Sequence, residues 1–305
     1  MTLTRGLCAQ AIVLLVIAGC GGGGESQPAG SSASVATTAP GPELETFDYD
    51  SAAPLSLQVR KERKEGAVTV QDVTYEDGDG QKVSAYLVVP GGKGPFAGVL
   101  FGHWLAEERS DRTEFLDEAV ALAARGVVSL LPQAVFPWKA APTGLEHDRQ
   151  AVIAQTVAFR RGLDVLSARD DVDPARLGFV GHDYGAMYGA LLAGADRRPK
   201  AYVLMAPDAT WSNWFLKFWL KSEAVDPYKK GFESLDPVNY VQEASPAAVF
   251  LQFGESDKYV PGYIADEIEA AVAEPKKVEG YGGGHELDSS AQAARGAWLA
   301  EQLGL

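Results

Sequence analysis

Hydrophobic and polar positions follow a regular pattern only from about residue 66 onward. Residues 67–75 and 83–89 alternate with the period of two that half-buried strands show, and the Gly- and Asp-rich stretch 76–80 between them predicts a hairpin turn. Residues 98–101 form a short continuous apolar run, typical of a strand buried on both faces. We therefore expect antiparallel strands first and buried parallel strands after them.

The rest of the chain alternates between short apolar runs and stretches with helical spacing. The apolar runs predict strands at 127–131, 177–180, 201–206, 247–253 and 277–281. The helical spacing predicts helices at 111–125, 148–168, 184–195, 261–273 and 289–303. Strands that alternate with helices predict a mostly parallel, eight-stranded sheet with helices on both faces.

Residues 207–246 interrupt this rhythm, because the segment is longer than a simple helix-to-strand connection needs. It is rich in large aromatic side chains: Trp211, Trp214, Phe215, Phe218 and Trp219. Two interpretations stay open. The segment is a helix packed on the body through an aromatic face, or a short lid whose aromatic residues line a substrate pocket.

The N-terminal residues differ from the body in composition. Arg5 precedes the apolar run 9–18, which is too short to span a bilayer and predicts a secretory signal peptide over 1–19. The run ends in small residues followed by Cys20, which resembles the lipobox of bacterial lipoproteins. That resemblance implies an extracytoplasmic protein held on a bacterial membrane by lipid on Cys20. The alternative is an ordinary signal peptide with a chance cysteine.

The Gly-, Ser- and Pro-rich residues 20–45 predict a flexible linker, so the folded domain is expected at 46–305. The two cysteines, Cys8 and Cys20, both precede this domain, which must be stabilised by its core without disulfides. Asp and Glu number 41 against 27 Lys and Arg, a formal net charge of −14. This balance argues against a nucleic-acid partner. The mixed charge run 60–65 is interpreted as a solvated surface segment.

The candidate chemistry centres on Gly181-His182-Asp183-Tyr184-Gly185, which lies between a predicted strand and a predicted helix. A strand, a Gly-x-nucleophile-x-Gly turn and a helix form a nucleophile elbow, in which small residues let the chain turn sharply. The position of the nucleophile is occupied by Asp183. We take Asp183 as the candidate nucleophile.

The partners of such a nucleophile are expected in the chain order acid, then histidine. Asp257 follows the predicted strand 247–253, and His285 follows the last strand within a Gly-rich loop. We therefore assign Asp257 and His285 to the catalytic pair and keep Asp208, which follows an earlier strand, as a rival acid. His103 is interpreted as a residue that positions its loop, and His182 as a packing residue. His147 is interpreted as a residue at the surface or at the rim of a pocket.

An oxyanion intermediate would need two backbone N–H donors. The loop after residue 101 and the residue after the nucleophile normally supply them, which gives Trp104 and Tyr184.

From Val83 to the C-terminus the chain resembles the dienelactone-hydrolase-like branch of the α/β-hydrolase superfamily, through 83–90, Gly94-Pro95-Phe96 and the short lid. The resemblance implies an α/β-hydrolase fold and a small-molecule substrate. The elbow departs from that branch, which places Cys or Ser there. Gly-His-Asp-aromatic-Gly is similar instead to the elbow of epoxide hydrolases and haloalkane dehalogenases, which carry larger helical caps.

An aspartate nucleophile suits an sp³ carbon, where it forms an alkyl ester, better than an ester, where it would form a mixed anhydride. Epoxide opening would also need an acid, for which the lid residues Tyr228 and Tyr240 are candidates. Halide release would need N–H donors such as the indoles of Trp104, Trp211 or Trp214. Two alternatives stay open: a dienelactone-type ester or lactone hydrolase with an altered nucleophile, and a non-catalytic ligand-binding lipoprotein. The sequence implies no cofactor and no metal site.

Overall fold

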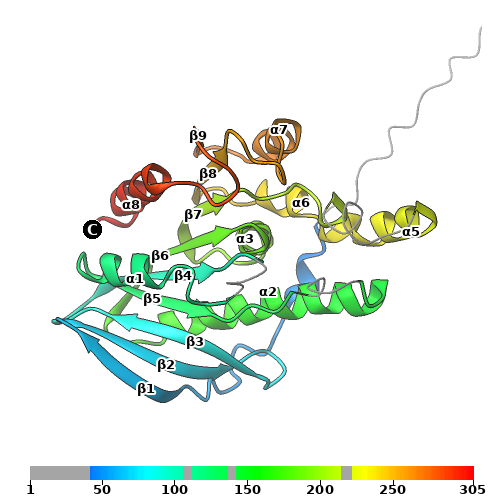
Figure 1. Ribbon diagram of the computed structural model, residues 1–305. Helices are drawn as coiled ribbons and strands as arrows, with labels where there is room; N and C mark the ends of the chain where they lie inside the picture. Colours follow the sequence, from blue (N-terminus) through cyan, green and yellow to red (C-terminus); the bar gives the residue numbers. More distant parts are fainter. Residues whose placement is uncertain (1–41, 106–110, 137–141, 214–221) are drawn as a thin grey trace, which may run out of the picture. The chain divides into compact units, whose positions relative to one another are not determined.

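The strands predicted from residue 67 onward pair into a single sheet in the computed structural model, which describes residues 42–105, 111–136, 142–213 and 222–305 (Figure 1). The predicted signal peptide, Cys20 and most of the predicted linker lie outside the described residues. No helix in the described ranges is long and apolar enough to cross a bilayer.

The described residues form a nine-stranded sheet in the order β1-β2-β3-β5-β4-β6-β7-β8-β9. The strands are β1 (Gln58–Glu65), β2 (Val68–Glu76), β3 (Lys82–Val89), β4 (Phe96–Gly102), β5 (Val127–Pro132), β6 (Val172–His182), β7 (Pro199–Met205), β8 (Ala248–Gly254) and β9 (Lys276–Tyr281). The pairs β1–β2, β2–β3 and β3–β5 are antiparallel, and the remaining pairs are parallel. The predicted hairpin and the mostly parallel sheet are thus confirmed.

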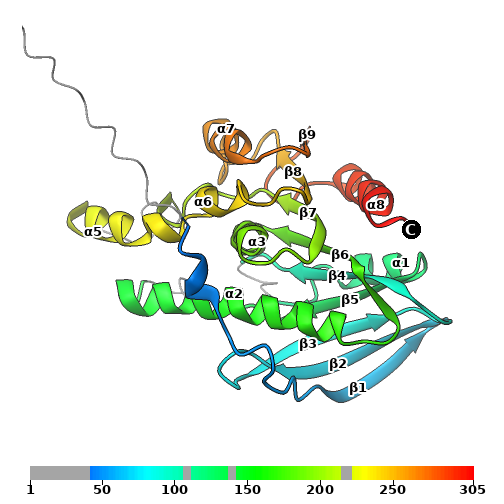
Figure 2. The same ribbon diagram turned by 180° about the vertical axis from the view of Figure 1, so that it is seen from behind.

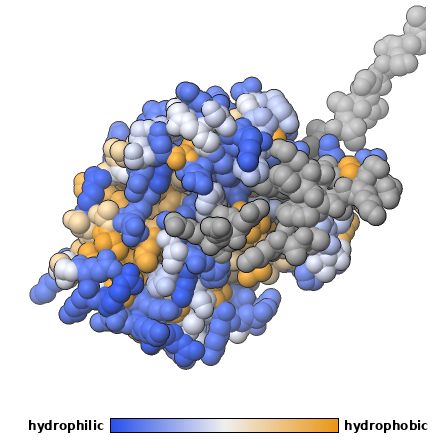
Figure 3. Space-filling model, in the orientation of Figure 1, coloured by the Kyte–Doolittle hydropathy of each residue, from blue (hydrophilic) through white to orange (hydrophobic). Residues whose placement is uncertain are grey.

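The prediction of eight strands was wrong because it missed β1, whose sequence was interpreted as a solvated surface segment. Every residue of β1 is exposed, yet the strand pairs with β2 along its length. An edge strand with no buried face shows no hydrophobic alternation, and its charges discourage further pairing at the edge. Figure 3 shows the hydrophilic surface over this part of the molecule.

Five helices lie close to their predicted positions: α1 (Leu116–Ala123), α2 (Leu145–Ser167), α3 (Tyr184–Ala195), α7 (Gly262–Ala271) and α8 (Ser289–Leu303). Two more, α5 (Ser222–Phe232) and α6 (Pro237–Val241), fall within the segment 207–246, for which no helix bounds were predicted. α1 is shorter than predicted, because residues 111–115 form turns in which Asp111 accepts the Thr113 N–H. Strand β6 begins earlier than predicted and includes Pro174.

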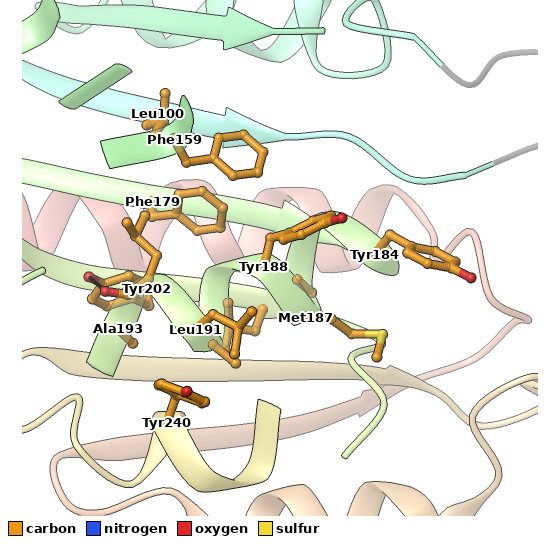
Figure 4. Close-up of a cluster of buried hydrophobic side chains, with 14 of the residues drawn as sticks. Leu100, Phe159, Phe179, Tyr184, Met187, Tyr188, Leu191, Ala193, Tyr202 and Tyr240 are labelled. Carbon is orange, nitrogen blue, oxygen red and sulfur yellow. Dashed lines mark hydrogen bonds between the residues drawn. The ribbon is translucent and has the colours of Figure 1, made fainter. Parts of the chain in front are cut away.

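Helices cover both faces of the sheet (Figures 1 and 2). Helices α1 and α8 pack on one face, and α2, α3, α6 and α7 pack on the other, so each face has its own buried core. Helix α3 is buried almost all round. Figure 4 shows its Tyr188 and Leu191 with Phe179 of β6 on one side and Tyr240 of α6 on the other. The element that begins at the elbow is therefore held on every side.

The folded body begins slightly before the predicted domain start at residue 46. A short 3-10 helix, η1 (Leu44–Phe47), buries Phe47 completely. The Glu43 N–H donates to the Tyr240 hydroxyl at 2.9 Å, and Arg160 donates to the Phe47 carbonyl at 2.6 Å. The last residues of the predicted linker are therefore part of the fold.

The described part of 207–246 is packed against the body. Trp211 is fully buried, and its indole N–H donates to the Leu235 carbonyl at 2.7 Å. Its ring lies against Tyr184 and Tyr188 of α3. The packed-helix interpretation holds here, whereas the aromatic residues at 214–219 lie outside the described residues.

Candidate active site

The turn between β6 and α3 holds Asp183 in a strained backbone conformation. Its φ is +55° and its ψ is −119°, and the residue is buried with only 1 % exposed. A Cβ on Gly181 would overlap the Gly185 backbone, and one on Gly185 would overlap the Gly102 carbonyl. Both glycines are needed because β4, the elbow and α3 approach so closely here. This is the sharp strand-turn-helix geometry of a nucleophile elbow.

The loops after β8 and β9 bring Asp257 and His285 to this turn. His285 Nδ1 lies 2.7 Å from Asp257 Oδ2, and His285 Nε2 lies 3.4 Å from Asp183 Oδ1. Asp257 Oδ1 accepts the N–H groups of Tyr259 and Val260 at 2.7 and 3.1 Å, which fixes the carboxylate. The structure thus brings together the three residues assigned from the sequence.

The imidazole of His285 lies between two carboxylates, and this governs its protonation. Burial by itself would lower the pKa of His285, but the hydrogen bonds and charges of Asp183 and Asp257 outweigh burial and raise the pKa from 6.5 to about 10. Burial tends to raise the pKa of Asp257, but the contact with His285 and the two N–H donors lower it overall. At neutral pH the ring of His285 is therefore an imidazolium that lies between the side chains of Asp183 and Asp257.

The loop after β4 supplies an N–H donor, but from a different residue than predicted. The Trp104 N–H donates to Glu114 Oε2 at 2.7 Å, so the prediction of Trp104 as an oxyanion donor was wrong. The Leu105 N–H instead donates to Asp183 Oδ2 at 3.0 Å. Tyr184, the second predicted donor, opens α3 directly after Asp183, where backbone N–H groups have no partner within the helix.

His103 explains why Leu105 is the donor. The Ala134 N–H donates to His103 Nε2 at 2.9 Å, so that nitrogen is an acceptor and Nδ1 carries the proton. His103 Nδ1 then donates to the Trp104 carbonyl at 2.9 Å. In a planar trans peptide the carbonyl and the next N–H point in opposite directions, so holding the Trp104 carbonyl aims the Leu105 N–H at Asp183. This agrees with the loop-positioning interpretation of His103.

Two further residues belong to the site and were missed or underestimated. Glu114, just before α1, had no signal in the sequence, yet it contacts both the Trp104 N–H and His182 Nδ1, the latter at 2.6 Å. His182, which was interpreted as a packing residue, is indeed 2 % exposed. Its Nε2 also lies 2.9 Å from the His285 carbonyl.

The rival acid and the lid tyrosines lie elsewhere. Asp208 accepts hydrogen bonds from the Thr210 N–H and the Asn213 side chain, whereas His285 Nδ1 is bonded to Asp257. The Tyr240 hydroxyl donates to the Ser234 carbonyl at 2.9 Å. The rival acid Asp208 and the candidate lid donor Tyr240 are therefore not placed in those roles.

Tyr228 and the candidate indole donors have different surroundings from one another. The Tyr228 hydroxyl donates to Asp148 at the start of α2, and the Trp211 N–H is bonded to Leu235, so neither group is placed as predicted. Trp214 lies outside the described residues. The Trp104 indole stacks on His182 with ring centroids 5.0 Å apart, and its N–H is buried and has no hydrogen-bond partner in the part of the chain that the structure describes. Within those same ranges, no cluster of three or more His, Cys, Asp or Glu could hold a metal ion.

Comparison with known proteins places the chain among relatives of unassigned activity. The uncharacterized protein Rv2307c of Mycobacterium tuberculosis (strain H37Rv) is 31 % identical over 213 residues, which cover 68 % of this chain and 69 % of the mycobacterial protein. This chain belongs to the same family. The uncharacterized protein MT2364 of M. tuberculosis strain CDC 1551 matches with the same values. No protein-family model matches the chain.

Solved structures resemble the fold. An acetyl xylan esterase from Paenibacillus sp. R4 superposes with a TM-score of 0.67 at 19 % identity, covering 82 % of this chain and 90 % of the esterase. Acetyl xylan esterase 1 from Thermoanaerobacterium sp. superposes with a TM-score of 0.70 at 15 % identity, covering 87 % and 95 %. Together with the strand order, this likeness confirms the α/β-hydrolase fold for this member of the Rv2307c family.

Proposed function

We propose that this protein is a hydrolase in which Asp183 is the nucleophile and attacks an sp³ carbon to form an alkyl-ester intermediate. The observation that carries the proposal is the carboxylate itself: it occupies the strained tip of the elbow and faces His285 Nε2 at 3.4 Å. The neighbouring groups of the site, the His285 ring and the Leu105 N–H, are both directed at this carboxylate. Holding a non-glycine residue at positive φ costs free energy, which is typical of functional positions.

The choice of carbon centre follows from the product of the first step. Attack of a carboxylate on an ester would give a mixed anhydride, which is more reactive than the ester it came from. Attack on a carbon that bears a leaving group gives an ordinary ester, which a second step can hydrolyse. In that first step a bond forms between Asp183 oxygen and carbon while the bond to the leaving group breaks, and the leaving group departs with the electron pair.

The charges around His285 then determine when the second step, hydrolysis of the ester on Asp183, can begin. Once Asp183 is esterified, it no longer holds a negative charge beside His285, so the pKa of His285 falls and the imidazolium can release its proton. The neutral imidazole takes a proton from water as the water attacks the Asp183 ester carbonyl. The resulting oxyanion would be stabilised by the N–H groups of Leu105 and Tyr184. His285 finally protonates the departing alcohol.

The surroundings favour a leaving group that departs as an anion over an epoxide. Epoxide oxygen must be protonated as the ring opens, but the hydroxyls of Tyr228 and Tyr240 are engaged by Asp148 and Ser234. The Trp104 indole N–H is buried without a partner in the described ranges, and its ring lies against that of His285, which makes it the candidate donor to a departing halide. Small halogenated compounds are therefore the first substrate class to test, followed by small epoxides.

A second candidate function is supported by the structural neighbours, which are named as esterases. In that case Asp183 would act as a base that activates water for direct attack on a carboxylic ester or lactone. His285 would serve as the cation that orients Asp183. The two functions predict different fates for the Asp183 carboxylate, which makes them separable.

The experiment combines trapping with isotope labelling. His285→Gln removes the base of the second step, so incubation with halogenated substrates should add the mass of the alkyl group to the peptide that contains Asp183. In the wild-type protein, a single turnover in heavy-oxygen water should place label in the Asp183 carboxylate. Asp208→Asn, which alters a buried acid that is hydrogen-bonded to Asn213, is the matched control for Asp183→Asn.

Each outcome separates the hypotheses. An adduct in His285→Gln and label at Asp183 support the alkyl-ester mechanism. Hydrolysis of a chromogenic acetate without label at Asp183 supports the base mechanism. If neither turnover nor adduct is found across halogenated, epoxide and ester substrates, a ligand-binding role replaces both.

We also propose that Cys20 carries lipid and anchors the protein outside the cytoplasm. The support is the sequence resemblance to a lipobox and the long linker that follows. Cys20→Ala in full-length protein should move it from the membrane fraction to the soluble fraction and abolish labelling by a fatty-acid analogue. Retention on membranes without the label would contradict lipid anchoring.

A further inference from the structure

Glu114 and His182 connect the three loops that hold the proposed catalytic groups. Glu114 Oε2 accepts the Trp104 N–H in the loop after β4, and Glu114 Oε1 contacts His182 Nδ1 in the elbow. His182 Nε2 lies 2.9 Å from the carbonyl of His285 in the loop after β9. The Trp104 ring stacks on the His182 ring with an angle of 13° between their planes, which closes the cluster.

The hydrogen bonds of this cluster can be accounted for completely. His182 Nε2 faces a carbonyl oxygen, which only accepts, so Nε2 carries a proton. His182 Nδ1 faces a carboxyl oxygen, so a second proton lies along that contact of 2.6 Å. The side chains of His182 and Glu114 are 2 % and 15 % exposed, which leaves little room for water to replace either partner.

This cluster has two consequences for Asp183. Glu114 holds the Trp104 N–H away from the site, while His103 holds the Trp104 carbonyl, and the Leu105 N–H is thereby aimed at Asp183 Oδ2. His182 holds the backbone of His285, whose ring must reach Asp183. Among the hydrogen bonds and ion pairs of the described residues, none joins Glu114 or His182 to the Asp183 carboxylate.

We propose that Glu114 and His182 are positioning residues, which fix the Leu105 amide and the His285 ring relative to Asp183 by bridging the three loops. The proposal rests on the proposed hydrolysis for its effect on turnover. The geometric part can be tested without any substrate.

The variants follow from the hydrogen-bond pattern. In Glu114→Gln the amide oxygen can still accept the Trp104 N–H, and the amide nitrogen can donate to His182 Nδ1, so the bridge survives without its charge. Glu114→Ala removes the bridge. Asp117→Ala removes an exposed acid three residues further on, at the start of α1, and serves as the control. Thermal unfolding of every variant shows whether each one folds.

Two measurements are made on each variant. Turnover should fall about 100-fold in Glu114→Ala with KM little changed, because a misplacement of about 1 Å has effects of that order. Glu114→Gln should restore most of that loss, and Asp117→Ala should match the wild type. Titration of the His285 ring by NMR should give a lower pKa in Glu114→Ala, where the ring is released from Asp183, but not in Glu114→Gln.

The results decide the proposal in each case. Full turnover in Glu114→Ala overturns it, and so do equal losses in Glu114→Ala and Glu114→Gln, which would mean that charge acts rather than position. If the wild type shows neither turnover nor an Asp183 adduct, the proposed function fails and the titration decides alone. In that case the positioning role is retained if the pKa of His285 falls in Glu114→Ala but not in Glu114→Gln. Any other pattern of pKa values rejects it.

Discussion

Replacing Asp183 with Asn is expected to convert His285 from a permanent cation at neutral pH into a group that titrates near neutrality. Asn keeps the size of the side chain and an oxygen that can accept the Leu105 N–H, which lies 3.0 Å from Asp183 Oδ2. It removes the negative charge, as esterification does in the proposed mechanism, and turns an amide NH2 group rather than an oxygen toward His285. The variant therefore imitates the electrostatics of the intermediate.

The size of the effect follows from the geometry. His285 Nε2 lies 3.4 Å from Asp183, and the two carboxylates together raise the pKa of His285 from 6.5 to about 10 against the effect of burial. Opposite unit charges about 4 Å apart interact by about 4 kcal/mol at an effective dielectric constant of about 20. Since about 1.4 kcal/mol changes a pKa by one, Asp183→Asn should lower the pKa of His285 by about 2 to 3.

The assay is an NMR titration of the histidine rings in the wild type and in Asp183→Asn. The chain has only four histidines, and the His285 signal is identified by its loss in His285→Gln. Asp208→Asn controls for the general loss of a buried carboxyl group. The mass of the Asp183→Asn protein is checked after each titration, because deamidation would restore the carboxylate.

The same charges predict how stability depends on pH. The pKa of His285 is higher in the folded protein than in the unfolded chain, so its contribution to stability is complete below about pH 6.5 and is lost as the pH rises through about 10. In Asp183→Asn the loss should occur at lower pH. A wild-type pKa of His285 near 6.5, or one that Asp183→Asn leaves unchanged, would refute the reasoning on charge.

Three further predictions concern other residues. Burial raises the pKa of Asp236 to about 8, so the folded form holds a proton that the unfolded chain has lost, and the wild type loses stability as the pH rises from about 4 to 8. Asp236→Asn keeps an acceptor oxygen and should raise Tm progressively over that range; an equal Tm difference at pH 4 and 8 would contradict this. Asp257→Asn should lower kcat by about 10⁴-fold, because His285 loses its orienting partner; Asp208→Asn, assayed in parallel, should lower it far less. Tyr240→Phe removes two hydrogen bonds and should cost about 1 to 2 kcal/mol of unfolding free energy in urea, with kcat unchanged.

The sequence predicted which side chains meet at the elbow wherever a residue's position follows from a single element. Asp183 is defined by the strand, glycines and helix around it, and His285 by a Gly-rich loop after the last strand. The place of Asp257 directly after the strand predicted at 247–253 favoured it over Asp208, and the contact of 2.7 Å agrees with that choice. Such local signals are sufficient here because the carboxyl ends of parallel strands lie at the same edge of the sheet, so residues that follow different strands come together.

Predictions failed where the role depends on which groups meet across loops. Trp104 and Leu105 are neighbours in the chain, and only the contacts of Glu114 and His103 decide which of their amides faces Asp183. Tyr240 looked like a lid residue by position, but its ring packs on Phe47 from the N-terminal segment. No sequence pattern encodes these pairings, since even partners as near in the chain as Trp104 and Glu114 meet only through the folded shape of their loop.

The sequence by itself determined the order of strands and helices, the position of the elbow and the presence of a carboxylate at its tip. Hydrophobic periodicity and glycine placement are local properties, so they can be read without the fold. Only the tertiary structure decided that β1 is a strand, that His285 lies between two carboxylates, and that Glu114 and His182 join three loops. These features arise from packing between distant segments, where burial and opposite charge act only after the chain has folded.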